Sequence, residues 1–270
     1  MAHDFIEVAA STDVGNVRQF NEDSIAFDPE RGVVVLADGM GGHRAGEVAG
    51  RMATEIILSA LQTEVAEFRS TANPHSPLRA VTKSINRANT AVFTAARTHP
   101  NYQGMGTTLA LALFYDNRVT LAHVGDSRIY RLRDSRLQLL TRDDSLLRDQ
   151  IELGLIAAAD AAESHNRSLV TRALGIEASV STHVRDDDAL PGDVFLLCSD
   201  GLNDLVDDAD IELILNSLRS NLPLAAGHLV QSAKDNGGYD NVSVILAKVR
   251  KAFPAASHAA WLKRLLGWLR

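Results

Sequence analysis

An aspartate that ends an apolar run and precedes a cluster of glycines restricts this chain more than any other feature. Residues 33–37 are all apolar and predict a buried strand, and Asp38-Gly39-Met40-Gly41-Gly42-His43 follows directly. A carboxylate at the end of a strand can bind a hard cation, and a glycine lets a neighbouring backbone carbonyl approach the same ion. This segment therefore predicts an oxygen-ligand metal site at the edge of a sheet.

The same pattern recurs elsewhere in the chain. Acids follow two other predicted strands at Asp126 and Asp200, and they precede strands at Glu22-Asp23 and Asp240-Asn241. In an antiparallel sheet the end of one strand lies beside the start of its neighbour, so these acids can gather at one edge. Clustered acids repel one another unless a cation lies among them. An oxygen site without His or Cys ligands favours Mg²⁺ or Mn²⁺, although any single Asp-Gly pair is more often a simple turn.

Charge and cysteine content exclude several classes of protein. The 270 residues carry a formal net charge of −7, which argues against a general nucleic-acid binder because phosphate backbones require a basic face. Cys198 is the only cysteine, so an internal disulfide is impossible, and its apolar neighbours predict a buried hydrophobic side chain. The N-terminal residues lack the pattern of a signal peptide, and no stretch is apolar enough to span a bilayer. We therefore expect a cytoplasmic protein.

The order of the predicted elements indicates an α+β fold. Alternating or β-branched apolar runs predict strands at residues 33–37, 108–115, 118–124, 128–133, 194–198 and 242–249. Helical spacing predicts two long helices, at about residues 46–68 and from about residue 77, and a further helix that opens at Pro223 and ends at Asn236. Hairpin-connected strands followed by helix pairs indicate antiparallel sheets covered by helices.

The chain divides into one domain and a tail. Residues 1–249 form the predicted domain, in which residues 145–175 interrupt the strand pattern and are compatible with a flap near the site or with an ordinary surface excursion. Residues 250–270 form a linker and a basic amphipathic segment, WLKRLLGWLR at 261–270. Its pattern fits docking on an anionic membrane surface or a protein partner, and equally a terminal helix packed on the domain itself.

Six short motifs occur along the chain and are specific as a set. They are Arg18-x-x-Asn21-Glu22-Asp23, Asp38-Gly39-Met40-Gly41-Gly42-His43, Gly104-x-Gly106-Thr107-Thr108, Gly125-Asp126-Ser127-Arg128, Ser199-Asp200-Gly201-Leu202 and Asp240-Asn241. Each is weak alone, but six in this order with fitting spacing are strong. The set resembles the metal-dependent protein phosphatase family (PPM, the type 2C class), and most of all its bacterial members. The resemblance covers about residues 5–249, and Thr171-Arg172-Ala173-Leu174-Gly175 matches a further bacterial motif.

The resemblance implies both a fold and an activity. The fold would be a four-layer αββα sandwich, in which two antiparallel sheets are flanked by antiparallel helix pairs. The activity would be that of a protein serine/threonine phosphatase, in which a water bridging two divalent metals attacks the phosphorus. Mn²⁺ or Mg²⁺ would be the cofactor, with two tightly bound ions and a third, weaker one. A monomer that acts on phosphorylated proteins and reverses a bacterial serine/threonine kinase is the expected biological setting.

The resemblance also assigns metal ligands residue by residue. Asp38 would bridge two metals, and the Gly39 carbonyl would bind one of them. Asp200 and Asp240 would bind the second metal. Asp126, together with Asp200, would hold the weaker third ion.

The remaining roles surround those ligands. Glu22 and Asp23 would orient metal-bound waters, and Asn241 would orient its neighbour. Arg18 would bind the substrate phosphate, because a guanidinium beside two metals suits bidentate capture of that group. His43 is a candidate proton donor to the leaving oxygen, since Met40 occupies the position of the acid histidine in animal relatives. A second departure is Asp144, where relatives often carry histidine.

Two other functions remain open at this point. One is a non-catalytic relative that uses the fold as a binding module, and the presence of Arg18, Asp38, Asp200 and Asp240 argues against it. The other is a different two-metal phosphoesterase that acts on small molecules or nucleic acid. The acidic balance and the lack of a basic aromatic groove weaken its nucleic-acid version.

Overall fold

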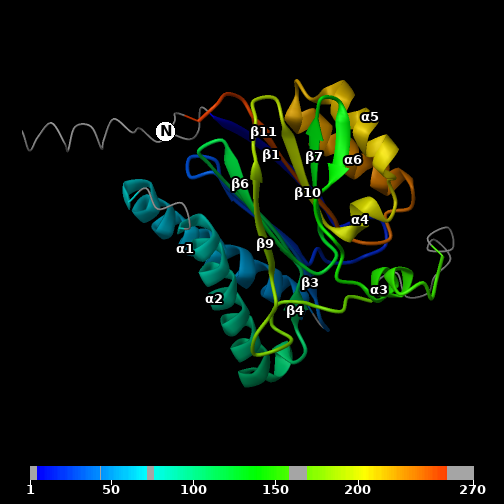
Figure 1. Ribbon diagram of the computed structural model, residues 1–270. Helices are drawn as coiled ribbons and strands as arrows, with labels where there is room; N and C mark the ends of the chain where they lie inside the picture. Colours follow the sequence, from blue (N-terminus) through cyan, green and yellow to red (C-terminus); the bar gives the residue numbers. More distant parts are fainter. Residues whose placement is uncertain (1–4, 43, 72–75, 158–168, 254–270) are drawn as a thin grey trace, which may run out of the picture.

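The computed structural model describes residues 5–42, 44–71, 76–157 and 169–253. Within these residues, two antiparallel sheets stack face to face, and a pair of helices covers each outer face (Figure 1). The predicted four-layer αββα sandwich is therefore confirmed. In Figure 1 the long helices α1 and α2 cover one side of the molecule, and α5 and α6 cover the opposite side.

Each sheet mixes strands from distant parts of the chain. Sheet I contains, in spatial order, β1 (Ile6–Asp13), β11 (Val242–Val249), β10 (Val194–Cys198), β7 (Arg128–Arg133) and β8 (Arg136–Leu139). Sheet II contains β2 (Asp23–Asp28), β3 (Val33–Met40), β5 (Leu109–Tyr115), β6 (Arg118–Val124) and β9 (His183–Asp188), and the short β4 (Gly106–Thr107) pairs with β3. The helices are α1 (Ala45–Thr71), α2 (Ser76–Thr98), η2 (Pro100–Tyr102), α3 (Leu146–Glu152), α4 (Asp200–Asn203), α5 (Asp208–Leu218) and α6 (Leu222–Asp235).

The continuous apolar runs are explained by burial on both faces of a sheet. Along β3, Val33 and Val35 pack under α1 and α2, whereas Val34 and Leu36 face sheet I. Side chains alternate across a strand, so a strand between two packed layers needs an apolar residue at every position. Strand β10 follows the same rule, because Leu196 packs under α5 and α6 and Phe195 points to sheet II.

Several predicted elements have the predicted ends, and others differ. Strands β6, β7, β10 and β11 begin and end where their patterns predict. Strand β3 continues past residue 37 to Met40, so Asp38 lies within the pleated strand. Helix α6 begins at Leu222, with Pro223 in its first turn and the Asn221 side chain accepting a hydrogen bond from the Leu224 N–H.

The segment between sheet strands β8 and β9 leaves the sandwich as an excursion. Its two ends are joined, because the Leu146 N–H donates to the Leu169 carbonyl at 2.9 Å and Ser145 pairs with Val170. Helix α3 lies in its first half, capped by the Ser145 side chain. The predicted flap at residues 145–175 includes residues 158–168, which are outside the described part of the chain.

Contacts with the body of the protein continue beyond the last strand. The Arg250 N–H donates to the Phe5 carbonyl, and the buried Phe253 side chain packs in the core between the sheets. The tail predicted at 261–270 lies outside the described residues. Among the helices that are described, none has the length and apolarity needed to cross a membrane.

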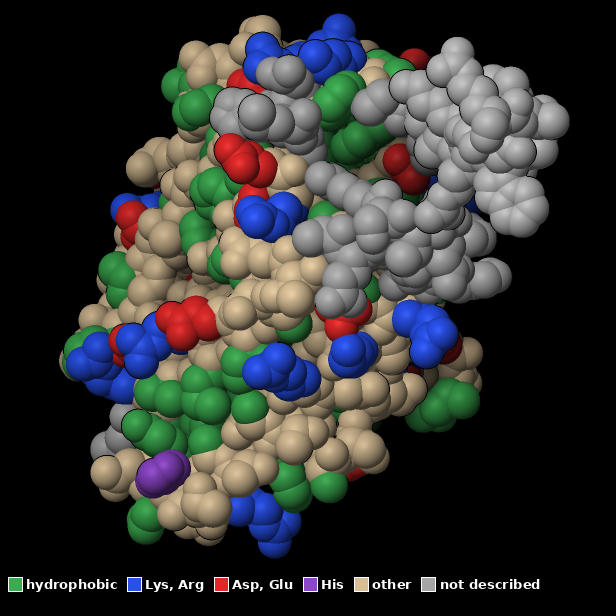
Figure 2. Space-filling view, turned by 90° about the vertical axis from the view of Figure 1, so that its left-hand side faces the viewer, with side chains coloured by type: hydrophobic (Ala, Val, Ile, Leu, Met, Phe, Trp, Pro, Cys, Tyr) green, Lys and Arg blue, Asp and Glu red, His purple; other side chains and the backbone are tan. Residues whose placement is uncertain are grey.

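On the face formed by the α1–α2 pair, basic and acidic side chains are interspersed (Figure 2).

Replacing Phe195 by alanine tests the core between the sheets. Its ring is fully buried and meets Phe114 of the opposite sheet edge-on, with ring centroids 5.2 Å apart and planes at 76°. Because the truncation leaves a cavity between two packed sheets, we expect the free energy of unfolding to fall by about 3–5 kcal/mol in denaturant titrations. The control Phe27→Ala removes a ring that is 41% exposed, and we expect a loss below about 1 kcal/mol. Equal losses would contradict this packing.

Candidate metal centre

The structure brings the predicted acids of both sheets to one edge of the sandwich. Asp23 of β2 and Asp38 of β3 are directly opposite each other in the strand register. Asp126 follows β6, Asp200 opens α4 at the end of β10, and Asp240 lies two residues before β11. The charges of Asp23, Asp126, Asp200 and Asp240 all act on Asp38. These five aspartates, which the sequence places at strand ends, therefore lie near one another in the structure.

These acids are desolvated and repel one another. Desolvation, followed by the neighbouring carboxylates, raises the pKa of both Asp38 and Asp200 well above the usual range. Desolvation also raises the pKa of Asp23 to about 6 and that of Asp126 to about 7. Like charges that share a site disfavour ionisation, and a cation among them reverses that effect. The arrangement is therefore unfavourable for the protein alone and favourable for a bound cation.

Two oxygen atoms of this cluster have no hydrogen-bond donor. They are Asp23 Oδ1 and Asp200 Oδ1, both buried and both without a partner among the described residues. A buried carboxylate oxygen is normally satisfied, so two orphaned oxygens in one cluster indicate that a ligand completes them. The oxygen atoms that the cluster offers are those of carboxylates, which matches the oxygen preference of Mg²⁺ and Mn²⁺. The residues present therefore fit the implied divalent cations.

Two glycines allow the backbone segments of the site to touch. A Cβ atom at Gly39 would lie 2.1 Å from the Gly46 carbonyl oxygen and 2.6 Å from that of Glu22. A Cβ atom at Gly201 would lie 2.0 Å from the carbonyl oxygen of Asn241. Any side chain at either position would push these segments apart. Glycine is therefore required where β3 meets the start of α1 and where α4 meets the Asp240 turn.

Hydroxyl groups hold the backbone of Asp38 in place. The Asp38 N–H donates to Thr108 Oγ1 at 3.0 Å, and Thr107 Oγ1 donates to the Asp38 carbonyl at 2.8 Å. The Thr108 hydroxyl also lies 2.6 Å from that of Ser127, next to Asp126. The motif at residues 104–108, which the sequence indicates only as tight strand packing, thus also connects two of the acids through hydrogen bonds.

The Asn241 side chain forms hydrogen bonds to both ends of the loop that carries Arg18. Its Oδ1 accepts the Glu22 N–H at 2.8 Å, and its Nδ2 donates to the carbonyls of Val14 and Phe20, each at 2.9 Å. One amide side chain therefore fixes both ends of the approach to β2. This contact set is broader than the predicted role of orienting a single neighbour.

Arg18 lies beside the acids and keeps its guanidinium accessible. Its Nη2 donates to Asp240 Oδ2 at 2.6 Å, and its side chain is 51% exposed. The charges of Asp38 and Glu22 also act on it. A guanidinium held at the rim of an acidic site can turn towards an incoming phosphate, for which its planar fork is suited.

Two acids near the site were missed by sequence reasoning. Asp204 lies one helical turn after Asp200, and its charge helps to raise the pKa of both Asp200 and Asp126, after desolvation. Asp143 also acts on Asp126, but it is engaged in a bidentate pair with Arg128. The spacing of Asp200 and Asp204 by four residues was the available signal, because it places both on one face of a helix.

Two other predicted residues have different outcomes. His43 lies outside the described residues. Cys198 is buried, and burial raises the pKa of its thiol to about 12, which agrees with a structural rather than a reactive cysteine.

Comparison with known proteins finds relatives that match most of this chain. The sequence model of a family described as protein phosphatase 2C matches residues 16–226. The serine/threonine protein phosphatase PstP of Mycobacterium tuberculosis is 38% identical over 246 residues, which are 90% of this chain and 45% of that protein. The serine/threonine phosphatase stp of Listeria welshimeri is 36% identical over 240 residues, which are 88% of this chain and 93% of that protein. The chain therefore spans less than half of PstP.

The fold is shared with a solved structure as well. The crystal structure of the catalytic domain of the serine/threonine protein phosphatase PstP in complex with two manganese ions superposes with a TM-score of 0.79 at 35% identity. The match covers 92% of this chain and 99% of that one.

Removing the charge of Asp38 should stabilise the protein when divalent cations are chelated. Desolvation and the neighbouring carboxylates raise the pKa of Asp38 above its value in the unfolded chain, so this group destabilises the fold as the pH rises above about 4. We expect Asp38→Asn to raise the free energy of unfolding at pH 8 by about 0.5–3 kcal/mol, the usual size of the effect of a single substitution.

The gain should shrink towards pH 4, where the carboxyl group is protonated in the unfolded chain as well, at about its ordinary pKa. Thermal melts in EDTA across this pH range measure the difference. The exposed Glu30→Gln is the matched control, since it removes a carboxylate that lies away from the cluster. A destabilised Asp38→Asn protein at pH 8 would show that the acids do not repel one another as described.

Proposed function

The chain belongs to the protein phosphatase 2C family, and from that premise we propose that it is a metal-dependent protein serine/threonine phosphatase. Its substrates would be phosphoserine and phosphothreonine esters in proteins. The observation that carries this proposal is the convergence of five aspartates, two of them with orphaned buried oxygens, beside an accessible arginine. The relatives PstP and stp, which are serine/threonine phosphatases, support it.

We assign the metal sites to the oxygen ligands at the sheet edge. Asp38, the Gly39 carbonyl, Asp200 and Asp240 would hold two ions of Mn²⁺ or Mg²⁺, and the two manganese ions in the PstP structure support this number. Asp126 and Asp200 would hold a weaker third ion. The charge of Asp204 acts on both of these acids, which makes it a further candidate ligand there. When bound, such cations supply the positive charge that activates a water and polarises a phosphoryl group.

Arg18 would bind and orient the substrate phosphate. Phosphoryl transfer spreads negative charge over the equatorial oxygens, and a guanidinium placed beside them stabilises that charge as it develops. The pair with Asp240 keeps Arg18 aimed at the site before substrate arrives. The exposed face of its guanidinium leaves donors accessible to the phosphate.

The remaining assignments concern the water and the leaving group. Glu22 and Asp23 would accept hydrogen bonds from the nucleophilic water, and the Ser199 hydroxyl holds Asp23 for that task through a bond of 2.8 Å to Oδ2. His43 would donate a proton to the departing seryl or threonyl oxygen. Residues 1–249 would form the catalytic domain, and residues 250–270 a separate linker and tail.

Hydrolysis of phosphopeptides tests the proposal directly. We expect phosphoserine and phosphothreonine peptides to be hydrolysed with Mn²⁺ present, and phosphotyrosine peptides much more slowly. Chelation should abolish the activity and added Mn²⁺ should restore it, because the carboxylates alone cannot activate water. Asp38→Asn should lower kcat by at least about a hundredfold while remaining folded, and Glu30→Gln should leave kcat unchanged.

Other outcomes would favour the alternatives. A protein that binds Mn²⁺ but hydrolyses neither phosphopeptides nor an aryl phosphate would be a binding module. Rapid hydrolysis of small phosphoesters with no turnover of any phosphopeptide would indicate a different class of phosphoesterase. Activity that survives chelation would contradict the metal assignment itself.

We also propose a cellular setting. Phosphorylated proteins imply a serine/threonine kinase, and this protein would dephosphorylate that kinase and its substrates. It would act as a cytoplasmic monomer that docks on the anionic inner face of a membrane through residues 261–270. The charge pattern supports this location, because residues 250–270 carry five cations and no acid, whereas the whole chain has a net charge of −7.

Tryptophan fluorescence tests the docking of the tail. Trp261 and Trp268 are the only tryptophans, so the signal reports on this segment alone. We expect a blue shift when vesicles of phosphatidylglycerol are added and none with phosphatidylcholine, because the cations require an anionic surface. Replacing Lys263 and Arg264 together by glutamate should remove the shift. An emission maximum that is already blue and does not respond to vesicles would indicate packing on the domain, and a shift only with a protein would indicate a partner.

A further inference from the structure

Asp144 is a buried carboxylate that three separate segments of the chain share. Its side chain is 1% exposed. Its Oδ2 accepts the Gly125 N–H at 3.1 Å, and its Oδ1 accepts from Arg172 Nη1 at 2.7 Å and lies 3.2 Å from His183 Nε2. The sequence marks this position only as a departure from relatives, which often carry histidine there. The structure shows that an anion at this position has specific partners.

The backbone of Asp144 joins the same segments. Its N–H donates to the Gly125 carbonyl, and its carbonyl accepts the Thr171 N–H, each at 2.8 Å. Asp144 therefore lies at the base of the excursion that leaves the sandwich at Leu146 and returns at Leu169. One residue connects that base to the turn that carries Asp126.

The turn at Gly125 connects Asp144 to the residues of the metal centre. Gly125 has a φ of +94°, and a Cβ atom there would lie 2.8 Å from the Thr108 side chain. The turn is thus held between Asp144 on one side and Thr108 on the other. Thr108 in turn accepts the Asp38 N–H and contacts the Ser127 hydroxyl. A displacement of Asp144 would therefore move the Gly125 turn and, with it, Asp126.

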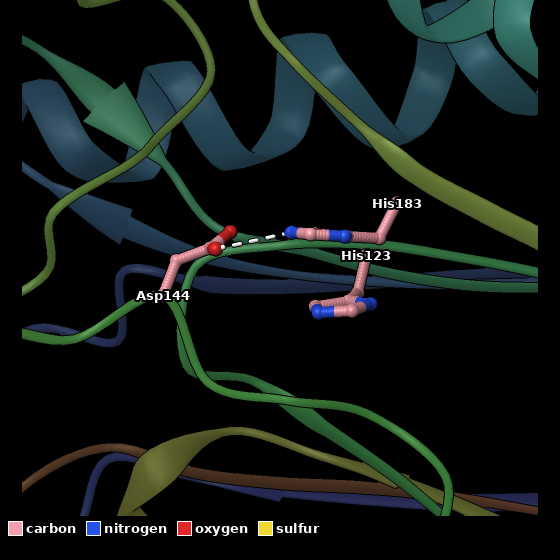
Figure 3. Close-up of side chains that lie close together, drawn as sticks. All are labelled: His123, Asp144 and His183. Atoms are coloured by element: carbon pink, nitrogen blue, oxygen red, sulfur yellow. Dashed lines mark hydrogen bonds and ion pairs between the residues drawn. The ribbon is translucent and has the colours of Figure 1, made fainter. Parts of the chain in front are cut away.

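The group around Asp144 is not arranged as a second metal site. The ligand atoms of His123, Asp144 and His183 lie within 4.8 Å of one another. However, the two imidazole rings are stacked, with centroids 4.8 Å apart and planes at 14° (Figure 3). The lone pairs of an imidazole lie in the ring plane, so two parallel stacked rings cannot both aim at one ion. His123 Nε2 is moreover 2.8 Å from the Arg142 carbonyl oxygen.

A guanidinium already supplies the positive charge at this point. Arg172 Nη1 lies 2.7 Å from Asp144 Oδ1 and 3.0 Å from His183 Nε2. A buried carboxylate requires such a partner, because an unpaired charge in this environment is strongly unfavourable. Arg172 follows the returning end of the excursion, so the ion pair ties that end to the Gly125 turn.

We propose that Asp144 is a positioning residue for the metal centre, and that its ion pair with Arg172 fixes the Gly125–Asp126 turn to the base of the excursion. This inference rests on the proposed function, because it concerns the ion that Asp126 would hold. The carboxylate touches neither substrate nor metal, and it acts by holding the turn. Loss of its charge should therefore weaken the most loosely bound cation, whereas the site formed by Asp38, Asp200 and Asp240 keeps its ligands and their immediate contacts.

The test is the binding of Mn²⁺ to the Asp144→Asn variant of the 270-residue chain, measured by isothermal titration calorimetry. Asparagine keeps an oxygen acceptor for the Gly125 N–H but removes the charge that Arg172 pairs with. We expect the dissociation constant of the weakest Mn²⁺ site to rise by about tenfold or more, as when other residues behind a metal ligand are changed. Phosphopeptide turnover should fall at low Mn²⁺ and recover at high Mn²⁺, with KM unchanged.

A matched control separates positioning from general stability. Asp193 is also buried, pairs with Arg133 at 2.6 Å and accepts the Leu190 N–H at 2.8 Å, but it precedes β10 at the end opposite Asp200. Asp193→Asn should lower the melting temperature without changing the Mn²⁺ titration. Arg172→Gln should weaken the same Mn²⁺ site as Asp144→Asn. The double variant should be little worse than the weaker of the two single variants, because both changes remove the same interaction.

Different results would refute the positioning role of Asp144 and the proposed function. A wild-type protein without phosphatase activity refutes the proposed function, whereas the calorimetry still measures Mn²⁺ binding. An unchanged Mn²⁺ titration in a folded Asp144→Asn protein overturns the positioning role even if the enzyme is active. Zinc binding that requires both Asp144 and His183 would also overturn it, since the carboxylate would then serve an ion instead of the guanidinium.

Discussion

Repulsion among carboxylates that the fold forces together is the constraint on which the rest of the structure depends. Asp23 and Asp38 face each other across neighbouring strands, where a protein selected for stability alone would place an opposite charge or an apolar pair. The pleated register fixes their backbones, so neither residue can retreat. The sandwich must therefore be stable enough to tolerate this arrangement until a cation compensates it.

The surrounding hydrogen bonds hold the backbone around the acids in place, and they do not neutralise the charge of the acids. Thr107 and Thr108 bind the peptide groups of Asp38, and Asn241 binds those of the loop that carries Arg18. Two buried carboxylate oxygens, Asp23 Oδ1 and Asp200 Oδ1, have no partner among the described residues. Glycines at residues 39 and 201 remove the side chains that would separate the segments. Preorganised ligands of this kind bind a cation without the entropy loss of ordering a loop.

The sequence predicts the parts of this protein in which local pattern and tertiary role coincide. Strands β6, β7, β10 and β11 are apolar because both their faces are buried, so their ends are visible in the pattern alone. Edge strand β9 carries three acids in its six residues, so its composition resembles a loop. Two of them have partners on other strands, because Asp186 bonds Thr120 of β6 and Asp187 pairs with Arg131 of β7. Asp144 and Asp204 have significance only through contacts with other segments, which no local spacing records completely.

The ligands come from both layers of the sandwich, and this has a consequence for how such a protein can adapt. Asp38 lies in β3 and Asp126 follows β6 of the same sheet, whereas Asp200 and Asp240 flank strands of the other. The distance between opposing ligands is therefore inherited from the thickness of the apolar layer that Phe114 and Phe195 fill. A lineage that repacks this layer for heat or cold changes the size of the cage as well, and its choice of ion evolves together with its interior.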